Sequence, residues 1–160
     1  MITGIDHITI GVADLDGGSA CYRRLGFNVQ PGGVHAGRGT HNALALNSAD
    51  YLELLAIRDE AEYLAVSRSG GAFARFIADG GGIYAIALAS DDLAADVAAM
   101  RARGAAISDP VDGARTTPEG SELRWRFATL DAGHGLPLVF IEHLGAPVSR
   151  RPAATTHPNS

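Results

Sequence analysis

The chain has 160 residues, of which 46% are hydrophobic and 19% are charged, a composition that suits one soluble globular domain with its own core. Its net charge of -5, and the absence of lysine among its 13 basic residues, argue against a surface that binds nucleic acid. The single cysteine, Cys21, excludes an internal disulfide. Because no leader opens the chain and no apolar run is long enough to span a membrane, we expect a cytoplasmic location.

Two stretches of the chain repeat each other. Residues 4–16 read GIDHITIGVADLD and residues 82–94 read GIYAIALASDDLA, so superposing Gly4 on Gly82 also aligns isoleucines, an aspartate and a leucine. A second echo relates residues 51–55 to residues 140–144. A repeat of this length indicates a duplicated module, and two facing modules are expected to enclose a cavity.

The first copy is predicted to contain a strand, a helix and three further strands. Residues 5–12 alternate apolar and polar side chains, which is typical of a strand covered on one face. Asp14 is the predicted N-cap of the helix and Gly26 its stop. The three strands that follow are expected over residues 27–30, 40–47 and 51–57. The predicted unit is therefore βαβββ.

The second copy repeats this order. An aspartate at position 91 or 92 begins its helix, Gly104 ends it, and strands are expected over residues 105–111, 122–130 and 136–144. Residues 60–78, within a linker that spans residues 59–81, have a helix-forming composition, and residues 146–160 read as a loose tail. We therefore expect one domain over residues 1–145, made of modules 1–58 and 82–145 joined by a helical linker.

These elements carry the pattern of a known family. An Asp-His-Ile start to the first strand, an Asp-Leu start to the helix, LGF after the helix and LEL on the fourth strand together resemble the vicinal oxygen chelate superfamily. Residues 31–57 resemble its glyoxalase-like branch, which includes bleomycin-resistance and extradiol-dioxygenase relatives. The resemblance implies an α+β fold in which tandem βαβββ modules form a cupped, partly open mixed β-barrel with the helices outside.

The resemblance also implies a divalent metal held between the modules. His7 matches the ligand on the first strand, Glu53 the ligand on the fourth strand, and Glu142 the ligand on the last strand of the second module. The remaining ligand position falls on Ala85, which has no donor atom. His7 and Glu53 stand opposite their apolar neighbours in strand alternation, and we expect Glu142 to face the cup in the same way.

One imidazole and two carboxylates suit Mn²⁺, Fe²⁺, Ni²⁺, Mg²⁺ or Zn²⁺, with water or substrate oxygens as further ligands. Such an ion would polarise a carbonyl group and acidify the adjacent proton, and Glu142 is the predicted proton acceptor. Isolated histidines and glutamates in strand patterns are often structural, so a metal-free pocket stays open as an alternative.

The remaining cavity residues are predicted from position. The alanine at position 85 is expected to make the cavity roomy on the side of the second module. His41 is a candidate substrate contact or support for a ligand, with a plain edge hydrogen bond as the alternative, whereas His35 reads as a loop residue. Aromatic candidates for the cavity wall are Tyr51, Phe140, and Trp125 or Phe127, with core packing as their alternative role. Arg124 or Arg126 is the candidate that binds an anionic group of the ligand.

Two classes of function follow from the resemblance. The first is a metal-dependent isomerase, lyase or epimerase that moves a proton on a small oxygenated molecule. The second is a metal-free protein that sequesters a small molecule such as an antibiotic in the same cavity. The expected partner in both is a small molecule, and a homodimer that exchanges strands between chains is a further possibility.

Overall fold

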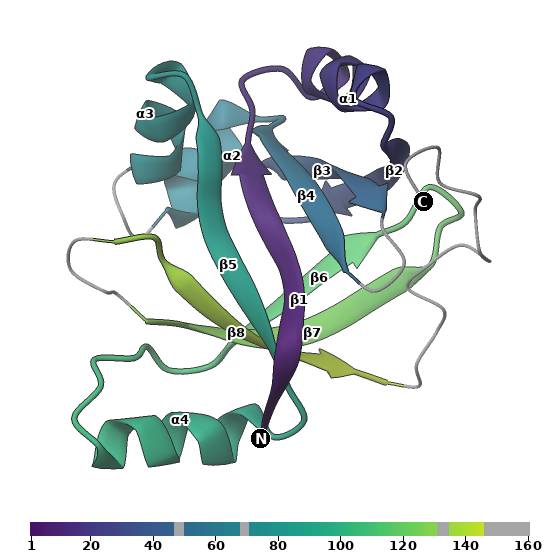
Figure 1. Ribbon diagram of the computed structural model, residues 1–160. Coiled ribbons are helices and arrows are strands. Elements are labelled where there is room, and N and C mark those ends of the chain that lie inside the picture. Colours follow the sequence, from purple (N-terminus) through teal and green to yellow (C-terminus); the bar gives the residue numbers. More distant parts are fainter. Residues whose placement is uncertain (47–49, 68–70, 131–134, 146–160) are drawn as a thin grey trace.

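The computed structural model describes residues 1–46, 50–67, 71–130 and 135–145. Its eight strands form one closed barrel in the order β1-β4-β3-β2-β6-β7-β8-β5, and the helices lie outside the barrel (Figure 1). The predicted α+β barrel of mixed strands is therefore confirmed. The tail predicted over residues 146–160 lies outside the described residues.

The first module folds in the predicted order. The carboxylate of Asp14 accepts hydrogen bonds from the backbone amides of Asp16 and Gly17, at 3.3 and 2.8 Å, and so begins the helix. The second strand runs five residues beyond its predicted end at residue 30 and includes the glycine-rich segment that ends at His35. The elements are β1 (Ile2–Gly11), α1 (Leu15–Arg24), β2 (Asn28–His35), β3 (Thr40–Leu46) and β4 (Tyr51–Ile57).

The second module differs from the prediction at one strand. Residues 105–110 form no strand, and only Ile107 makes an isolated bridge, to Leu130. Pro110 has no backbone N–H to donate, so the ladder begins after it. The linker contains α2 (Glu60–Val66) and α3 (Ala72–Ala78), and the module contains β5 (Gly82–Ser90), α4 (Leu93–Ala102), β6 (Val111–Thr116), β7 (Glu122–Leu130) and β8 (Leu138–Leu144).

The two modules join within the chain along two unequal seams. β1 and β5 pair antiparallel over most of their lengths, whereas β2 and β6 share only the pair Val34 and Thr116. Gly33 lies at the second seam with a φ of +143°, and a Cβ there would collide with the backbone carbonyl of Thr116. The barrel is therefore closed, but its closure at β2 and β6 is narrow.

The apolar cores lie between the sheet and the helices. Ile10, Ala45 and Leu54 are buried in one core beneath α1, with Leu15 and Tyr22 of that helix packed against it. The second core lies beneath α4 and contains Leu93, Val97, Ile107, Ala128 and Phe140. Because these cores take up the outward-facing apolar side chains, the inward-facing positions of the barrel do not need to fill its interior.

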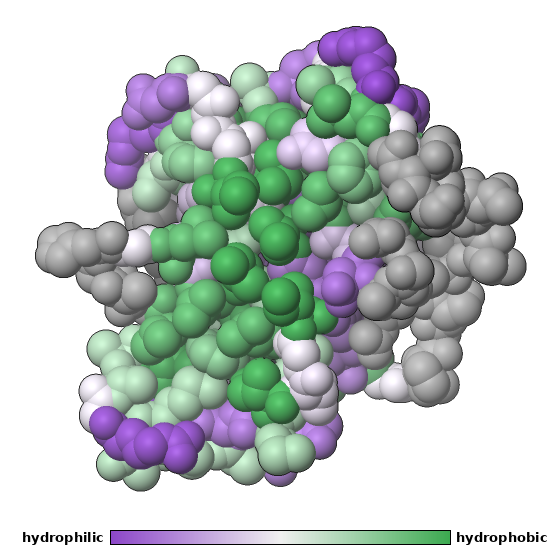
Figure 2. Space-filling model, viewed as in Figure 1, coloured by the Kyte–Doolittle hydropathy of each residue, from purple (hydrophilic) through white to green (hydrophobic). Residues whose placement is uncertain are grey.

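The outer face of the β1 and β5 seam is also apolar. Figure 2 shows apolar side chains gathered at the centre of this face, over β1 and β5. Ile5 and Ile83 on these strands are 51% and 55% exposed. None of the helices in the described ranges has the length and apolar composition needed to cross a membrane.

Candidate functional site

The barrel encloses a cavity of about 920 Å³ that side chains of both modules line. A closed barrel of eight strands is usually filled by side chains or holds one small ligand, so a volume of this size fits a ligand site. Ala85 and Ala87 face this interior from β5 and contribute little bulk to it. The prediction of a roomy second-module wall rests on the same small residues.

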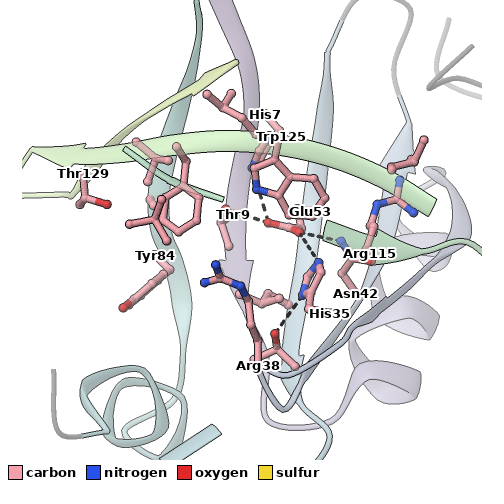
Figure 3. Close-up of a pocket in the computed structure, with 18 of the residues that line it drawn as sticks. His7, Thr9, His35, Arg38, Asn42, Glu53, Tyr84, Arg115, Trp125 and Thr129 are labelled. Atoms are coloured by element: carbon pink, nitrogen blue, oxygen red, sulfur yellow. Dashed lines mark hydrogen bonds and ion pairs between the residues drawn. The ribbon is translucent and has the colours of Figure 1, made fainter. Parts of the chain in front are cut away.

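Glu53 on β4 is the centre of a buried polar cluster (Figure 3). Its Oε1 accepts a hydrogen bond of 2.6 Å from the Asn42 side-chain amide, and its Oε2 accepts one of 3.0 Å from the Thr9 hydroxyl. The Nε2 atom of His7 lies 3.5 Å from Oε2, and the Nε2 atom of His35 lies 4.0 Å from Oε1. Both oxygens of the carboxylate thus face an imidazole and a neutral donor.

A β-bulge brings Asp6 into the same cluster. Ile5 pairs with Leu88 and His7 with Ala87, so Asp6 is an extra residue on β1 without a partner on β5. The bulge allows the side chains of two consecutive residues to turn inward. His7 Nδ1 donates to Asp6 Oδ1 at 2.7 Å, and this bond leaves the Nε2 atom of His7 directed at Glu53.

Asp6 also ties the two modules together. His143 on β8 donates from Nε2 to Asp6 Oδ2 at 3.0 Å. The Tyr51 hydroxyl lies 3.0 Å from His7 Nδ1 and 3.3 Å from Asp6 Oδ1, and the Tyr51 ring stacks on His7. One carboxylate therefore orients an imidazole from each half of the barrel.

Burial and hydrogen bonding set the charges in this part of the cluster. Burial alone would raise the pKa of Asp6, but hydrogen bonds from His143 and His7 outweigh it and hold that pKa well below its ordinary value. Burial alone would lower the pKa of His7, yet the bond to Asp6 and the negative charge of Glu53 raise it. His7 is therefore stabilised as an imidazolium between two carboxylates.

The other imidazole of the cluster shifts in the opposite direction. Burial, together with the positive charges of Arg115 and Arg38, lowers the pKa of His35, and the negative charge of Glu53 only partly opposes this. Its Nδ1 atom lies 2.9 Å from the Thr40 hydroxyl, so Nε2 is the nitrogen that faces the cavity. Despite burial, the pKa of Glu53 is lowered by His7 and His35 and by its two hydrogen bonds.

At the positions that match His7 and Glu53, the second module carries apolar residues. Thr9 pairs with Glu53 in the first module, and Ala87 pairs with Val139 in the second. Because the repeat carries Thr9 onto Ala87, the structural counterpart of Glu53 is Val139. The two ligand-type positions of the second module are therefore occupied by Ala85 and Val139, neither of which has a donor side chain.

The prediction that Glu142 faces the cavity is wrong. Ile141 and His143 line the cavity, so Glu142 lies on the opposite face of β8, across from Arg126 of β7. Phe140 shares that outer face and is buried beneath α4, so it is a core residue and not a substrate contact. Matching the two sequences by their letters pairs Glu53 with Glu142, three residues beyond its structural counterpart Val139. Because three is an odd number, this error in register reverses which residues of β8 point inward.

The other predicted site residues divide between the cavity and the surface. His7, Glu53, Tyr51, Ala85 and Trp125 line the cavity together. His41 lies on the outer face of β3, in a separate small depression beside α1. Arg124 is at the cavity rim with its side chain 69% exposed, where it forms an ion pair with Glu122.

Sequence reasoning missed several residues that the structure brings into the site. The bulge that admits Asp6 leaves no sequence signal. His143 is not among the predicted residues, because its neighbour Glu142 is the residue expected to face the cavity. His35 was assigned to a loop because glycines precede it, although it ends β2. Asn42 alternates with Thr40 on the inner face of β3, and that alternation is the one available signal.

The residues present do not fit the metal site that the fold family implies. His7 and Glu53 supply donors, but Ala85 and Val139 supply none, and Glu142 points away. The described residues contain no group of three His, Cys, Asp or Glu side chains arranged to hold a metal ion. Each oxygen of Glu53 already accepts a hydrogen bond from a neighbouring side chain.

Comparison with solved structures supports the fold. Methylmalonyl-CoA epimerase from Streptomyces coelicolor, in complex with 2-nitronate-propionyl-CoA, is 26% identical with a TM-score of 0.65 over 89% of this chain and 95% of that chain. The epimerase from Mycobacterium tuberculosis is 26% identical with a TM-score of 0.66 over 90% of each chain. A hypothetical protein from Staphylococcus aureus is 21% identical with a TM-score of 0.74, and the match spans 89% of this chain but only 59% of that chain.

The family model for the glyoxalase-like domain matches residues 5–160. The chain therefore belongs to the glyoxalase-like family of the vicinal oxygen chelate superfamily. The comparison with curated proteins finds no match.

Proposed function

We propose that this chain catalyses proton transfer at a carbon next to a carbonyl group, in the manner of an epimerase or isomerase, with His35 as the base and His7 as the cation that stabilises the enolate. The observation that supports it most is that two buried imidazoles flank one carboxylate, each with its Nδ1 atom already engaged. The environments push the two pKa values apart, as expected for an acid and a base in one site.

In this proposal His35 accepts the substrate proton. Its Nε2 lone pair takes the proton from the α-carbon, and the electrons of the C–H bond move onto the carbonyl oxygen to give an enolate. Glu53 stabilises the imidazolium that forms 4.0 Å away. When the enolate turns over in the cavity, the imidazolium of His35 returns the proton to the other face of the same carbon and gives the epimer. Return of the proton to a different carbon gives the isomer.

His7 supplies positive charge to the same reaction. It is held by Asp6 and is stabilised as an imidazolium, so it is suited to stabilise the negative charge that develops on the enolate oxygen. This division of roles uses side chains of the first module alone. No metal ion takes part in the proposed steps, because the second module offers no donor at the positions of Ala85 and Val139.

Solvent exchange provides the test. Methylmalonyl-CoA is the first substrate to try, since similar structures are epimerases of that compound, followed by other 2-substituted acyl thioesters and 2-hydroxy ketones. We expect deuterium from D₂O to enter the α-carbon, measured by mass spectrometry, and the rate to survive treatment with EDTA. His35→Gln should reduce the rate at least about 100-fold, since general bases contribute this much or more.

His41→Gln is the matched control, because His41 is a histidine on the outer face of β3. An equal loss of rate in both variants would contradict the role of His35. Exchange that requires added Mn²⁺ or Zn²⁺ would contradict the metal-free assignment while leaving proton transfer intact.

The rate should depend on pH in a bell shape. His35 has a pKa below 6.5, so the rate falls as the pH decreases through that value and the base becomes protonated. His7 has a pKa above 6.5, so the rate also falls as the pH rises through its value and the imidazolium is lost. A rate that falls on neither the acid nor the alkaline side, over the whole pH range in which the chain stays folded, would argue against both roles.

A metal-free binding protein is the second candidate. The apolar wall of Ala85, Val139 and Ile141, with a cavity of about 920 Å³, favours the sequestration of a bulky ligand such as an antibiotic. Ligand-induced stabilisation without any solvent exchange would support this function. Purified chain should then show a melting temperature that rises with the drug and no turnover across the panel.

A further inference from the structure

We propose that Arg115 on β6 is an anion-binding group of the cavity, so that the ligand carries a carboxylate or another compact anion attached to an apolar body. This inference names the ligand class of the site and rests on the proposed use of the cavity for a small molecule. The arginines suggested by the sequence for this role, Arg124 and Arg126, are both exposed and paired with acidic side chains.

Arg115 lines the cavity and is only partly exposed. Its guanidinium donates to the backbone carbonyl of Gly32 at the narrow seam between β2 and β6. Among the described residues, no carboxylate lies within ion-pair distance of it, although arginine presents five N–H donors in a planar fork. A partly buried cation with most donors unused is suited to a bidentate anion.

The charge of the cavity agrees with this assignment. The charged side chains that line the cavity are Glu53, His7, Arg38, Arg115 and the rim pair of Glu122 and Arg124, and Asp6 is bonded to His7. With His7 as an imidazolium, these are four positive and three negative groups. Positive charge is therefore in excess inside a chain whose net charge is -5. In Figure 3 the two arginines lie on opposite sides of the Glu53 cluster.

An apolar platform lies beside the arginine. Trp125 pairs with Gly113 across β6 and β7, and a Cβ at Gly113 would collide with the indole nitrogen, so the glycine makes room for the ring. The ring meets His35 edge-on at 6.0 Å between centroids. Trp125 is also the one tryptophan of the chain, so its fluorescence reports on occupation of the cavity.

The test compares two ligands of equal shape and different charge. Cyclohexanecarboxylate and cyclohexanecarboxamide are titrated into the full chain, followed by Trp125 fluorescence at pH 7.5 and confirmed by calorimetry. We expect the carboxylate to bind at least about tenfold more tightly, and the preference to shrink as salt is added. Arg115→Gln should reduce the ratio of the two affinities to about one, and Arg126→Gln, at an exposed position outside the cavity, should leave it unchanged.

Three outcomes would overturn the proposal: equal binding of both ligands by the native chain, no binding of either, or a preference that survives Arg115→Gln. The salt dependence of the native chain decides the matter if Arg115→Gln fails to fold. Because the measurement is at equilibrium, it is independent of turnover. An anion preference without solvent exchange would refute the catalytic proposal alone, and exchange without the preference would refute this one alone.

Discussion

The two modules share a fold, but their inner faces differ at the positions where the fold family places metal ligands. The wall of the first module contains Asp6, His7, His35 and Glu53, which form one connected polar cluster. At the matching positions the second module presents Ala85 and Val139. Duplicated strands can keep their pairing and their outer cores while their inner side chains diverge, because the folding free energy comes mainly from the outward apolar residues beneath α1 and α4.

This contrast explains why a resemblance of fold does not transfer a metal site. In the superfamily pattern the two modules contribute equally to the site between them. In this chain the polar groups of the first module bond to one another, and His143 of the second module donates a hydrogen bond to Asp6. Chemistry here is expected at one wall, with the other wall shaping the space for the ligand.

The largest expected change in stability comes from removing the Asp6 carboxylate, which joins the two modules. Asp6→Asn should lower the free energy of unfolding by about 3 kcal/mol at pH 7, because it removes one of the two carboxylates that stabilise the buried imidazolium of His7 and also the charged acceptor of His143. Equilibrium unfolding in urea measures this difference in free energy. Asp112→Asn is the control, since Asp112 has a side chain that is 84% exposed and should cost less than about 0.5 kcal/mol.

The stability difference between the native chain and Asp6→Asn should depend on pH. The folded-state pKa of Asp6 lies below its ordinary value of 3.8, so its stabilisation is complete above that pH and disappears as the pH falls below it. The native chain and Asp6→Asn should therefore become more alike in stability as the solution is acidified. Equal costs for Asp6→Asn and Asp112→Asn at pH 7 would refute the central position of Asp6.

Filling the space under the tryptophan tests the apolar wall. Gly113→Ala places a methyl group where the Trp125 indole lies, and we expect a cost of about 2 kcal/mol together with a changed near-ultraviolet circular dichroism. Thr116→Ala on the exposed end of the same strand provides the comparison. An unaltered spectrum and stability in Gly113→Ala would mean that the ring is not held as described.

Adding metal-ligand side chains to the second module tests whether their absence there weakens metal binding. Ala85→His combined with Val139→Glu adds an imidazole and a carboxylate at the counterparts of His7 and Glu53. We expect Zn²⁺ affinity to rise at least about tenfold, or about 1.4 kcal/mol, by calorimetry. Ala85→Gln with Val139→Gln should show no such gain. Stoichiometric metal already bound by the native chain with equal affinity would contradict the asymmetry.

The smallest effect is expected at Glu142. Because this carboxylate lies on the outer face of β8, Glu142→Gln should change the stability by less than about 0.5 kcal/mol and leave solvent exchange intact. Glu53→Gln, which removes the charge between the two imidazoles, should abolish exchange. Loss of exchange in Glu142→Gln would return the role of base to the second module.

The duplicated pattern was enough to predict most of the fold. Alternation in residues 5–12, the aspartate caps and the repeated order of elements are local signals, and the barrel with outer helices follows from them. The same signals place His7 and Glu53, since both follow the alternation of well-formed strands. Tyr51, Ala85 and Trp125 were also correctly expected to line the cavity.

Pairing between distant strands decided the rest. The bulge at Asp6 exists only because β1 pairs with β5, and the inward face of β8 is set by its pairing with β5 and β7. Alternation determines that neighbouring residues face opposite sides, but it cannot say which side is the interior until the sheet has closed. The sequence by itself therefore determined the barrel and two residues of its polar wall, and the tertiary structure determined that Val139 and not Glu142 faces them from the second module.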